Sequence, residues 1–184
     1  ENWSWEGCEG RTAAVEVYAR GREAELLLNG RSVGRRAISR GGTTKFRVLY
    51  EPGELTAVIR DETGKETART SLRSAGKETK LSLVPEAETI RPDQLLYVRL
   101  RYTDDQGTVK PGLRGEIHVQ VEGGILLALG NACSYNERGY LTDTTDTWFG
   151  EALAIIRPEG DVTLTARSPF GEAKVTVPAG EKQG

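Results

Sequence analysis

Histidine, the side chain that most often transfers protons near neutral pH, occurs once in the 184-residue chain, as His118. Any Ser-His-Asp arrangement would have to use this imidazole. Apolar and polar residues alternate around it, and His118 falls on the polar side of the stretch 116–122. Because that side of a half-buried strand faces water, we interpret His118 as a surface residue without a catalytic role.

Carboxylates are more numerous, but they form no recognisable catalytic pair. Three of them share one irregular segment (Asp143, Asp146 and Glu151), and two lie in a turn (Asp104 and Asp105). Glycoside hydrolysis needs two carboxylates across a sugar pocket, one with a raised pKa, and the sequence marks no such pocket. A calcium loop at 103–107 is an alternative, although a type I turn explains the same residues. We therefore predict solvated turn acids, no catalytic residue and no metal site.

Cysteine usage and charge limit the cofactors and partners. Two cysteines and one histidine cannot complete a zinc site of four such ligands. Cys8 and Cys133 have no CxxC spacing, so we expect free thiols in separate domains, which favours a cytoplasmic location slightly over secretion. Glycine-rich phosphate-binding motifs are absent, and we expect no cofactor. The net charge of −2 gives no reason to expect a nucleic-acid partner, and apolar runs as short as Ile125–Leu129, which is among the longest, give none to expect a membrane partner.

The aromatic residues suggest a different kind of site. The chain has three tryptophans, two of them near its start (Trp3 and Trp5) and one at Trp148. An exposed aromatic plane can stack on the C–H face of a sugar ring, whereas buried tryptophans serve only to anchor the chain. Tyr135, Tyr140 and Trp148 lie together in the irregular segment 130–150, so we take these three as candidate carbohydrate contacts.

The elements that must position these residues are strands. A period of two recurs along the chain and no segment has a convincing helical period, which predicts an all-β protein with very little helix. Turn residues such as Asn29-Gly30, Pro52-Gly53 and Pro111-Gly112 separate roughly a dozen short strands. That number exceeds one seven-strand sandwich, so we predict two consecutive immunoglobulin-like antiparallel β-sandwiches, residues 1–76 and 77–184.

Several strings resemble a known family. Trp3–Gly7 reads WSWEG, Ala24–Gly34 reads AELLLNGRSVG and Tyr50–Val58 reads YEPGELTAV. These resemble the sandwich domain that follows the catalytic barrel in family-2 glycoside hydrolases of the bacterial β-galactosidase type. In the second half, Leu127–Ala132 (LALGNA) and Phe149–Arg157 (FGEALAIIR) resemble the final immunoglobulin-like domain of the same enzymes.

The resemblance, which runs from about Trp3 to Val177, implies a parent that is a retaining β-glycosidase. Its two catalytic glutamates would lie on a (β/α)₈ barrel, which needs about 250 residues and eight helices. No residue of this chain matches the motifs that carry those glutamates. The chain has no methionine, and we expect it to be an excised, non-enzymatic piece of a longer bacterial protein.

Three functions follow from these observations. The first is a non-catalytic accessory region whose partner is the catalytic barrel of the same parent chain, which it packs against and stabilises. The second is a carbohydrate-binding module that uses the loop aromatics. The third is a cell-surface immunoglobulin-like adhesion module. The first predicts an exposed apolar patch where the barrel was removed, and the second predicts exposed aromatics around a shallow groove.

Overall fold

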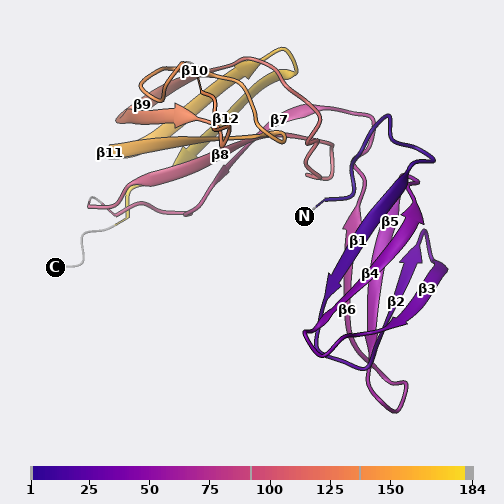
Figure 1. Cartoon of the computed structure of the whole chain (residues 1–184). Coiled ribbons are helices and arrows are strands. Elements are labelled where there is room, and N and C mark those ends of the chain that lie inside the picture. The colour runs from indigo at the N-terminus through magenta and orange to yellow at the C-terminus, as the bar shows by residue number, and fades with distance from the viewer. Residues whose placement is uncertain (1, 92, 137, 181–184) are drawn as a thin grey trace. The chain divides into compact units, whose positions relative to one another are not determined.

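The structure, a computed structural model, describes residues 2–91, 93–136 and 138–180. The described residues contain strands and no helix, which confirms the all-β class predicted from the period of two. The chain divides into two compact units, Glu1–Ala75 and Gly76–Gly184 (Figure 1). The sequence-based boundary after residue 76 lies one residue further along. Each unit has its own hydrophobic core.

The first unit is a sandwich of two unequal antiparallel sheets. One sheet pairs only two strands, β1 with β4, and the other has four strands in the order β3-β2-β5-β6. Their bounds are β1 Thr12–Tyr18, β2 Glu23–Leu28, β3 Arg31–Ala37, β4 Thr43–Leu49, β5 Glu54–Arg60 and β6 Glu66–Arg73.

The core of the first unit follows the alternation in its sequence. On β4, Phe46 and Val48 are buried while Arg47 and Leu49 are exposed, as a strand with one wet face requires. The β2–β3 hairpin turns at Asn29 and Gly30, whose φ values of 50° and 77° are those of the tight turn that an Asn-Gly pair predicts. Asn29 also fixes the bend at Pro52-Gly53, because its side chain accepts a hydrogen bond from the Glu54 N–H and donates one to the Pro52 carbonyl.

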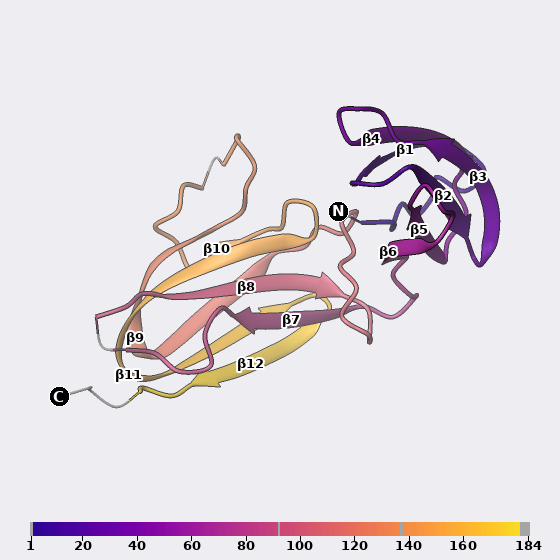
Figure 2. The same cartoon turned by 90° about the horizontal axis from the view of Figure 1, so that it is seen from below.

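The second unit contains the longest strands. Its six strands are β7 Lys80–Pro85, β8 Leu96–Thr103, β9 Ile117–Gly130, β10 Thr144–Thr145, β11 Glu151–Ser168 and β12 Gly171–Val177. They pair in the order β10-β9-β11-β8-β7, with β12 added on the later part of β11. Figure 2 shows β9 and β11 curving along most of the length of this unit.

Two bent strands connect the two layers of the second unit. The later part of β11, from Thr163, pairs with the early part of β9 and with β12. Its earlier part, up to Pro158, pairs with the late part of β9 and with β8. The bend falls at the register shift between Pro158 and Thr163, opposite Gly123, which has a φ of 73°. One pair of strands thus contributes to both layers.

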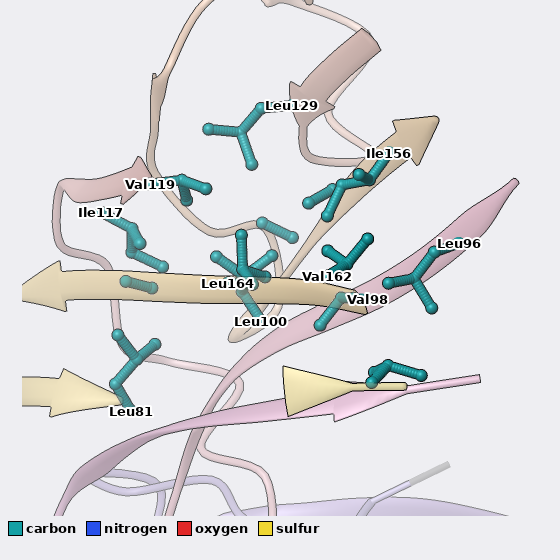
Figure 3. Close-up of a cluster of buried hydrophobic side chains, with 14 of the residues drawn as sticks. Leu81, Leu96, Val98, Leu100, Ile117, Val119, Leu129, Ile156, Val162 and Leu164 are labelled. Carbon is teal, nitrogen blue, oxygen red and sulfur yellow. The ribbon is translucent and has the colours of Figure 1, made fainter. Parts of the chain in front are cut away.

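The core of the second unit lies between these layers. Side chains from β7, β8, β9 and β11 converge there, and ten of them are labelled in Figure 3. Val98, Leu100 and Leu164 are completely buried. Tyr102 is also buried, and its hydroxyl donates to the Gly115 carbonyl while its ring packs edge-on against Phe170. Burial raises the pKa of the Tyr102 phenol, which therefore stays protonated and able to donate.

Candidate functional site

A hollow of about 480 Å³ lies on the second unit, on the outer side of the layer formed by β8, β11 and the late part of β9. Strand residues form most of it, and the segment after β9 supplies the rest. Its lining residues are Glu86, Arg99, Ala128, Gly130, Asn131, Ala132, Tyr140, Trp148, Glu151, Ala152, Leu153 and Ile155.

The base of the hollow is apolar because β11 carries an unbroken apolar stretch at this point. Ala152, Ala154 and Ile156 point into the core and are buried. Leu153 and Ile155 therefore project from the opposite face, where they are half-buried. Strands that are apolar on both faces are typical of sheets covered on both sides. In the part of the chain that the structure describes, this outer face is only partly covered.

Ion pairs supply the polar part of the lining. Arg99 on β8 contacts Glu86 just after β7, with 3.0 Å between the guanidinium and the carboxylate. Arg101 contacts Glu151 at the start of β11 at 2.6 Å. Each carboxylate that faces the hollow is therefore neutralised by an arginine, and these side chains still have donor and acceptor positions for a bound molecule.

A tyrosine closes one side of the hollow, and a glycine makes room for it. The backbone N–H of Leu129 donates to the Tyr140 carbonyl at 2.9 Å. A Cβ atom at Gly130 would lie 2.4 Å from Cδ1 of Tyr140, so only glycine lets the ring pack this closely on the end of β9. Tyr140 nevertheless remains 51% exposed. Its ring is held in place and is still accessible to a ligand.

A tryptophan forms another part of the wall. The Arg114 guanidinium lies 4.9 Å from the Trp148 ring centroid, within the range of a cation–π contact. Phe149 packs edge-on against the same ring at 5.2 Å. Phe149 has a φ of 50°, which is rare for a bulky residue, and the hydrogen bonds between the backbones of Trp148 and Glu151 stabilise this turn. The turn orients Trp148 toward the hollow.

The three aromatic residues predicted as carbohydrate contacts do not form one group. Tyr140 and Trp148 both line the hollow. Tyr135 is 88% exposed and does not belong to the lining. Glu137, in the same segment, lies outside the described residues. Sequence reasoning missed Leu153 and Ile155, although the apolar run of β11 was a signal that both faces of this strand are covered.

The remaining chemical candidates have structural partners. His118 is exposed on β9 and lies 3.1 Å from Glu116, while its Nδ1 lies 3.0 Å from the Thr144 hydroxyl. Arg138 pairs with the same Glu116 at 2.7 Å and is the main reason that the pKa of this carboxyl is below its ordinary value. These contacts connect the segment after β9 to the beginning of that strand.

The turn acids also have structural roles. Asp104 is buried, and its carboxylate accepts hydrogen bonds from the backbone N–H groups of Gly76, Gln106 and Thr108. Among the described residues, no group of three or more His, Cys, Asp or Glu side chains could hold a metal ion. Both cysteines are free thiols, one in each unit. Residues 2–91, 93–136 and 138–180 include no helix of the length and hydrophobicity that a membrane span requires.

Comparison with known families assigns the second unit. Residues 81–177 match the family described as glycoside hydrolase family 2 C-terminal domain 5, and residues 10–68 match a domain of unknown function, DUF4982. The first match covers more than half of the chain. The chain therefore belongs to the family of C-terminal domains of family-2 glycoside hydrolases, as the sequence strings predicted.

Individual relatives agree with this assignment. A β-galactosidase of Bacteroides ovatus, BoGH2A, is 26% identical over 179 residues, which are 91% of this chain and 20% of that protein. A family-2 glycosyl hydrolase of Bacteroides cellulosilyticus superposes with a TM-score of 0.88 at 26% identity, over 98% of this chain and 24% of the other. A family-2 β-glucuronidase shares the fold, with a TM-score of 0.84 at 20% identity. The superposition covers 100% of this chain and 20% of that protein. The chain thus spans about a fifth to a quarter of these proteins.

Proposed function

We propose that this chain is the non-catalytic C-terminal accessory region of a β-galactosidase-type glycoside hydrolase, and that it packs against the catalytic barrel of the same parent chain and stabilises it. The observation that carries the proposal is the half-buried aliphatic surface of Leu153 and Ile155 on the outer face of β11. An accessory domain that is separated from its barrel would expose such a surface.

The composition of the hollow suits a protein contact. Its base is aliphatic, Tyr140 and Trp148 supply aromatic area, and two arginine–carboxylate pairs border it. Aromatic and arginine side chains are enriched where proteins associate. Covering the exposed parts of Leu153 and Ile155 would stabilise the docked state by about 1 kcal/mol for each side chain.

The test places a charge on this face in the parent enzyme. Ile155→Lys should lower the melting temperature of the parent and the specific activity that survives heating. Gln120→Lys, at an exposed position of β9, is the matched control and should leave both unchanged. Equal behaviour of the two variants would rule out docking through this face.

The β-galactosidase type is supported by the likeness to the enzyme of Bacteroides ovatus, at 26% identity. It is tested with the parent enzyme on chromogenic β-galactosides and β-glucuronides. Faster hydrolysis of the galactoside supports the proposal, and hydrolysis of the glucuronide alone rejects it. Activity of the present chain alone on either substrate would contradict its non-catalytic role.

Carbohydrate binding is a second candidate function, because Tyr140 and Trp148 line one hollow together with charged side chains that can bond to sugar hydroxyls. Calorimetric titration of the chain with β-galactosides and plant polysaccharides tests this function. Binding that Trp148→Ala abolishes and Tyr135→Ala preserves would support it, because Tyr135 does not line the hollow. No binding up to millimolar sugar would reject it.

A further inference from the structure

Strand β1 of the first unit has a free edge. It pairs with β4 on one side, and no other strand of the described part of the chain pairs with its opposite side. The two-stranded sheet therefore ends at β1, while the sheet that faces it has four strands. In Figure 1, β1 lies at the side of this unit with β4 next to it.

A hollow of about 640 Å³ opens beside this edge. Its lining includes all seven residues of β1 together with Leu26, Leu55, Ala57, Thr70 and Leu72 of the facing sheet. Ala13 and Val15 point inward from β1 and pack against the core, yet both are only partly buried. The sandwich is thus incompletely closed along β1, in the place where one more strand would cover its core.

The composition of β1 does not protect this edge. Natural edge strands usually carry lysine, proline or inward-pointing charges that prevent pairing with other chains. β1 reads TAAVEVY, and Lys45 of β4 pairs with its only charged residue, Glu16, at 2.6 Å. The facing sheet ends at β3, which carries Arg31, Arg35 and Arg36, and at β6, which carries Glu66, Arg69 and Arg73. β4, the other edge of the two-stranded sheet, carries Lys45 and Arg47. Of these four edges, β1 is the one suited to pair with another strand.

The hydrogen bonds at its two ends show which β1 groups face the free edge. The Ala19 N–H donates to the Gly42 carbonyl, and the Arg11 carbonyl accepts from the Tyr50 N–H. In an antiparallel pair, alternate residues point their backbone groups toward the partner. The odd-numbered residues therefore face β4, and Thr12, Ala14, Glu16 and Tyr18 direct their N–H and C=O groups outward.

From these features we infer that the first unit self-associates through β1, which pairs antiparallel with β1 of a second copy about a two-fold axis at Val15. This register places Ala14 opposite Glu16 of the second copy and Thr12 opposite its Tyr18. All four outward-facing residues then exchange backbone hydrogen bonds, and no like charges meet across the strands. A two-fold contact of this type closes on itself and gives a dimer.

Two large exposed side chains would also contact each other between the two copies. Tyr18 is 72% exposed and Leu49 is 60% exposed. Leu49 is the β4 partner of Thr12. In the inferred register Tyr18 of the second copy lies opposite Thr12 on the other side, so Thr12 separates Leu49 from that tyrosine. Neighbouring strands are ~4.8 Å apart, and the ring of Tyr18, whose hydroxyl donates to Glu16 of its own strand at 2.5 Å, has to lean across the small threonine to make this contact. The same contact forms twice, once on each side of the axis.

Sedimentation velocity of this chain at ~1–100 µM provides the test. The expected species is a dimer of the 20.1 kDa chain. Ala14→Glu, which sets a carboxylate opposite Glu16 of the second copy, should raise the dissociation constant about tenfold or more. Adding Glu16→Gln should restore the dimer, because the two carboxylates no longer face each other and Lys45, the β4 partner of residue 16, meets no second cation. Ala14→Gln, which matches glutamate in size without its charge, should preserve the dimer, and Gln120→Glu at an exposed position of the second unit is the matched control.

Circular dichroism of each variant separates loss of pairing from loss of fold. A monomeric wild-type chain over the whole concentration range would overturn the inference, as would a dimer that tolerates Ala14→Glu. Failure of Glu16→Gln to rescue a folded Ala14→Glu variant would overturn the inferred register. Ile155→Lys should leave the dimer intact, so self-association through β1 and docking through β11 can fail independently.

Discussion

The side-chain amide of Asn131 donates a 2.6 Å hydrogen bond to the carboxylate of Asp146 and a 3.1 Å bond to the Asp146 backbone carbonyl. The Asn131 side-chain oxygen also accepts from the Cys133 N–H at 2.9 Å. One amide therefore joins the two ends of the irregular segment that supplies Tyr140 to the hollow. It acts together with the Arg138–Glu116 and Thr144–His118 contacts, which join the middle and later parts of the segment to the beginning of β9.

Asn131→Ala should therefore loosen this segment. Three polar groups lose a hydrogen bond, one of them the charged Asp146 carboxylate, so the free energy of unfolding should fall by about 1–2 kcal/mol. Trypsin should also cleave faster after Arg138, which lies in the segment. Asn136→Ala is the matched control, because the Asn136 side chain donates to the nearby Gly139 carbonyl at an exposed site. Equal cleavage rates in both variants would show that Asn131 does not hold the segment.

A second prediction concerns the bend shared by β9 and β11. Gly123 has a φ of 73°, and a Cβ atom built there would lie 1.8 Å from the Asp161 carbonyl oxygen. Gly123→Ala must therefore displace the backbone of β11, and we expect a loss of about 2–4 kcal/mol in the stability of the second unit. Gly160→Ala, at the same bend but with open space around the site of its Cβ, should cost about 1 kcal/mol or less. Urea unfolding measures both values.

The period of two made the cores predictable. Phe46 and Val48, like Val98 and Leu100, face inward because burial of one face of a strand imposes alternation on its sequence. Asn29-Gly30 predicted its hairpin because few residue pairs tolerate two successive positive φ values. These features depend on local chemistry alone, which is why one sequence was sufficient.

The candidate site was less predictable. Tyr135 and Tyr140 look equivalent in the sequence, and only the close approach of Tyr140 to Gly130 separates them. No local rule gives the path of an irregular segment of this length. Leu153 and Ile155 were missed for a different reason. An unbroken apolar run does not say which face of the strand is covered by its own sheet and which by a neighbour.

A third prediction follows from a carboxylate buried in the first unit. The Glu25 carboxylate forms ion pairs with the guanidinium groups of Arg35, at 3.0 Å, and Arg60, at 3.2 Å. The Arg35 contact is the largest cause that lowers the pKa of Glu25 below its ordinary value. A carboxyl with a lowered pKa in the folded state adds stability above its unfolded pKa and loses that stability as the pH falls through the folded value.

Glu25→Gln should therefore cost about 1–3 kcal/mol at pH 7, and the cost should shrink as the pH falls below the ordinary carboxyl pKa of ~4.3. Urea unfolding of both proteins between pH 7 and pH 3 measures this difference. Glu62→Gln, in an exposed turn of the same unit, should change stability little at any of these pH values. A cost that is constant over the whole pH range would mean that Glu25 stabilises the fold by packing and not by charge.

The last prediction concerns the residues that precede β1. Trp3 is 3% exposed, packs edge-on against Tyr50 at 4.9 Å and donates its indole N–H to the Glu51 carbonyl. Trp3→Ala removes a large buried ring and leaves a cavity next to the hollow that opens beside β1, so it should cost about 3–5 kcal/mol of unfolding free energy. Trp5→Ala is the natural control because Trp5 is 43% exposed, and it should cost about 1 kcal/mol or less. If both variants unfold at the same urea concentration, the segment before β1 does not belong to the core of the first unit. If only Trp3→Ala is destabilised, the buried ring of Trp3 is what joins this segment to the core of the first unit.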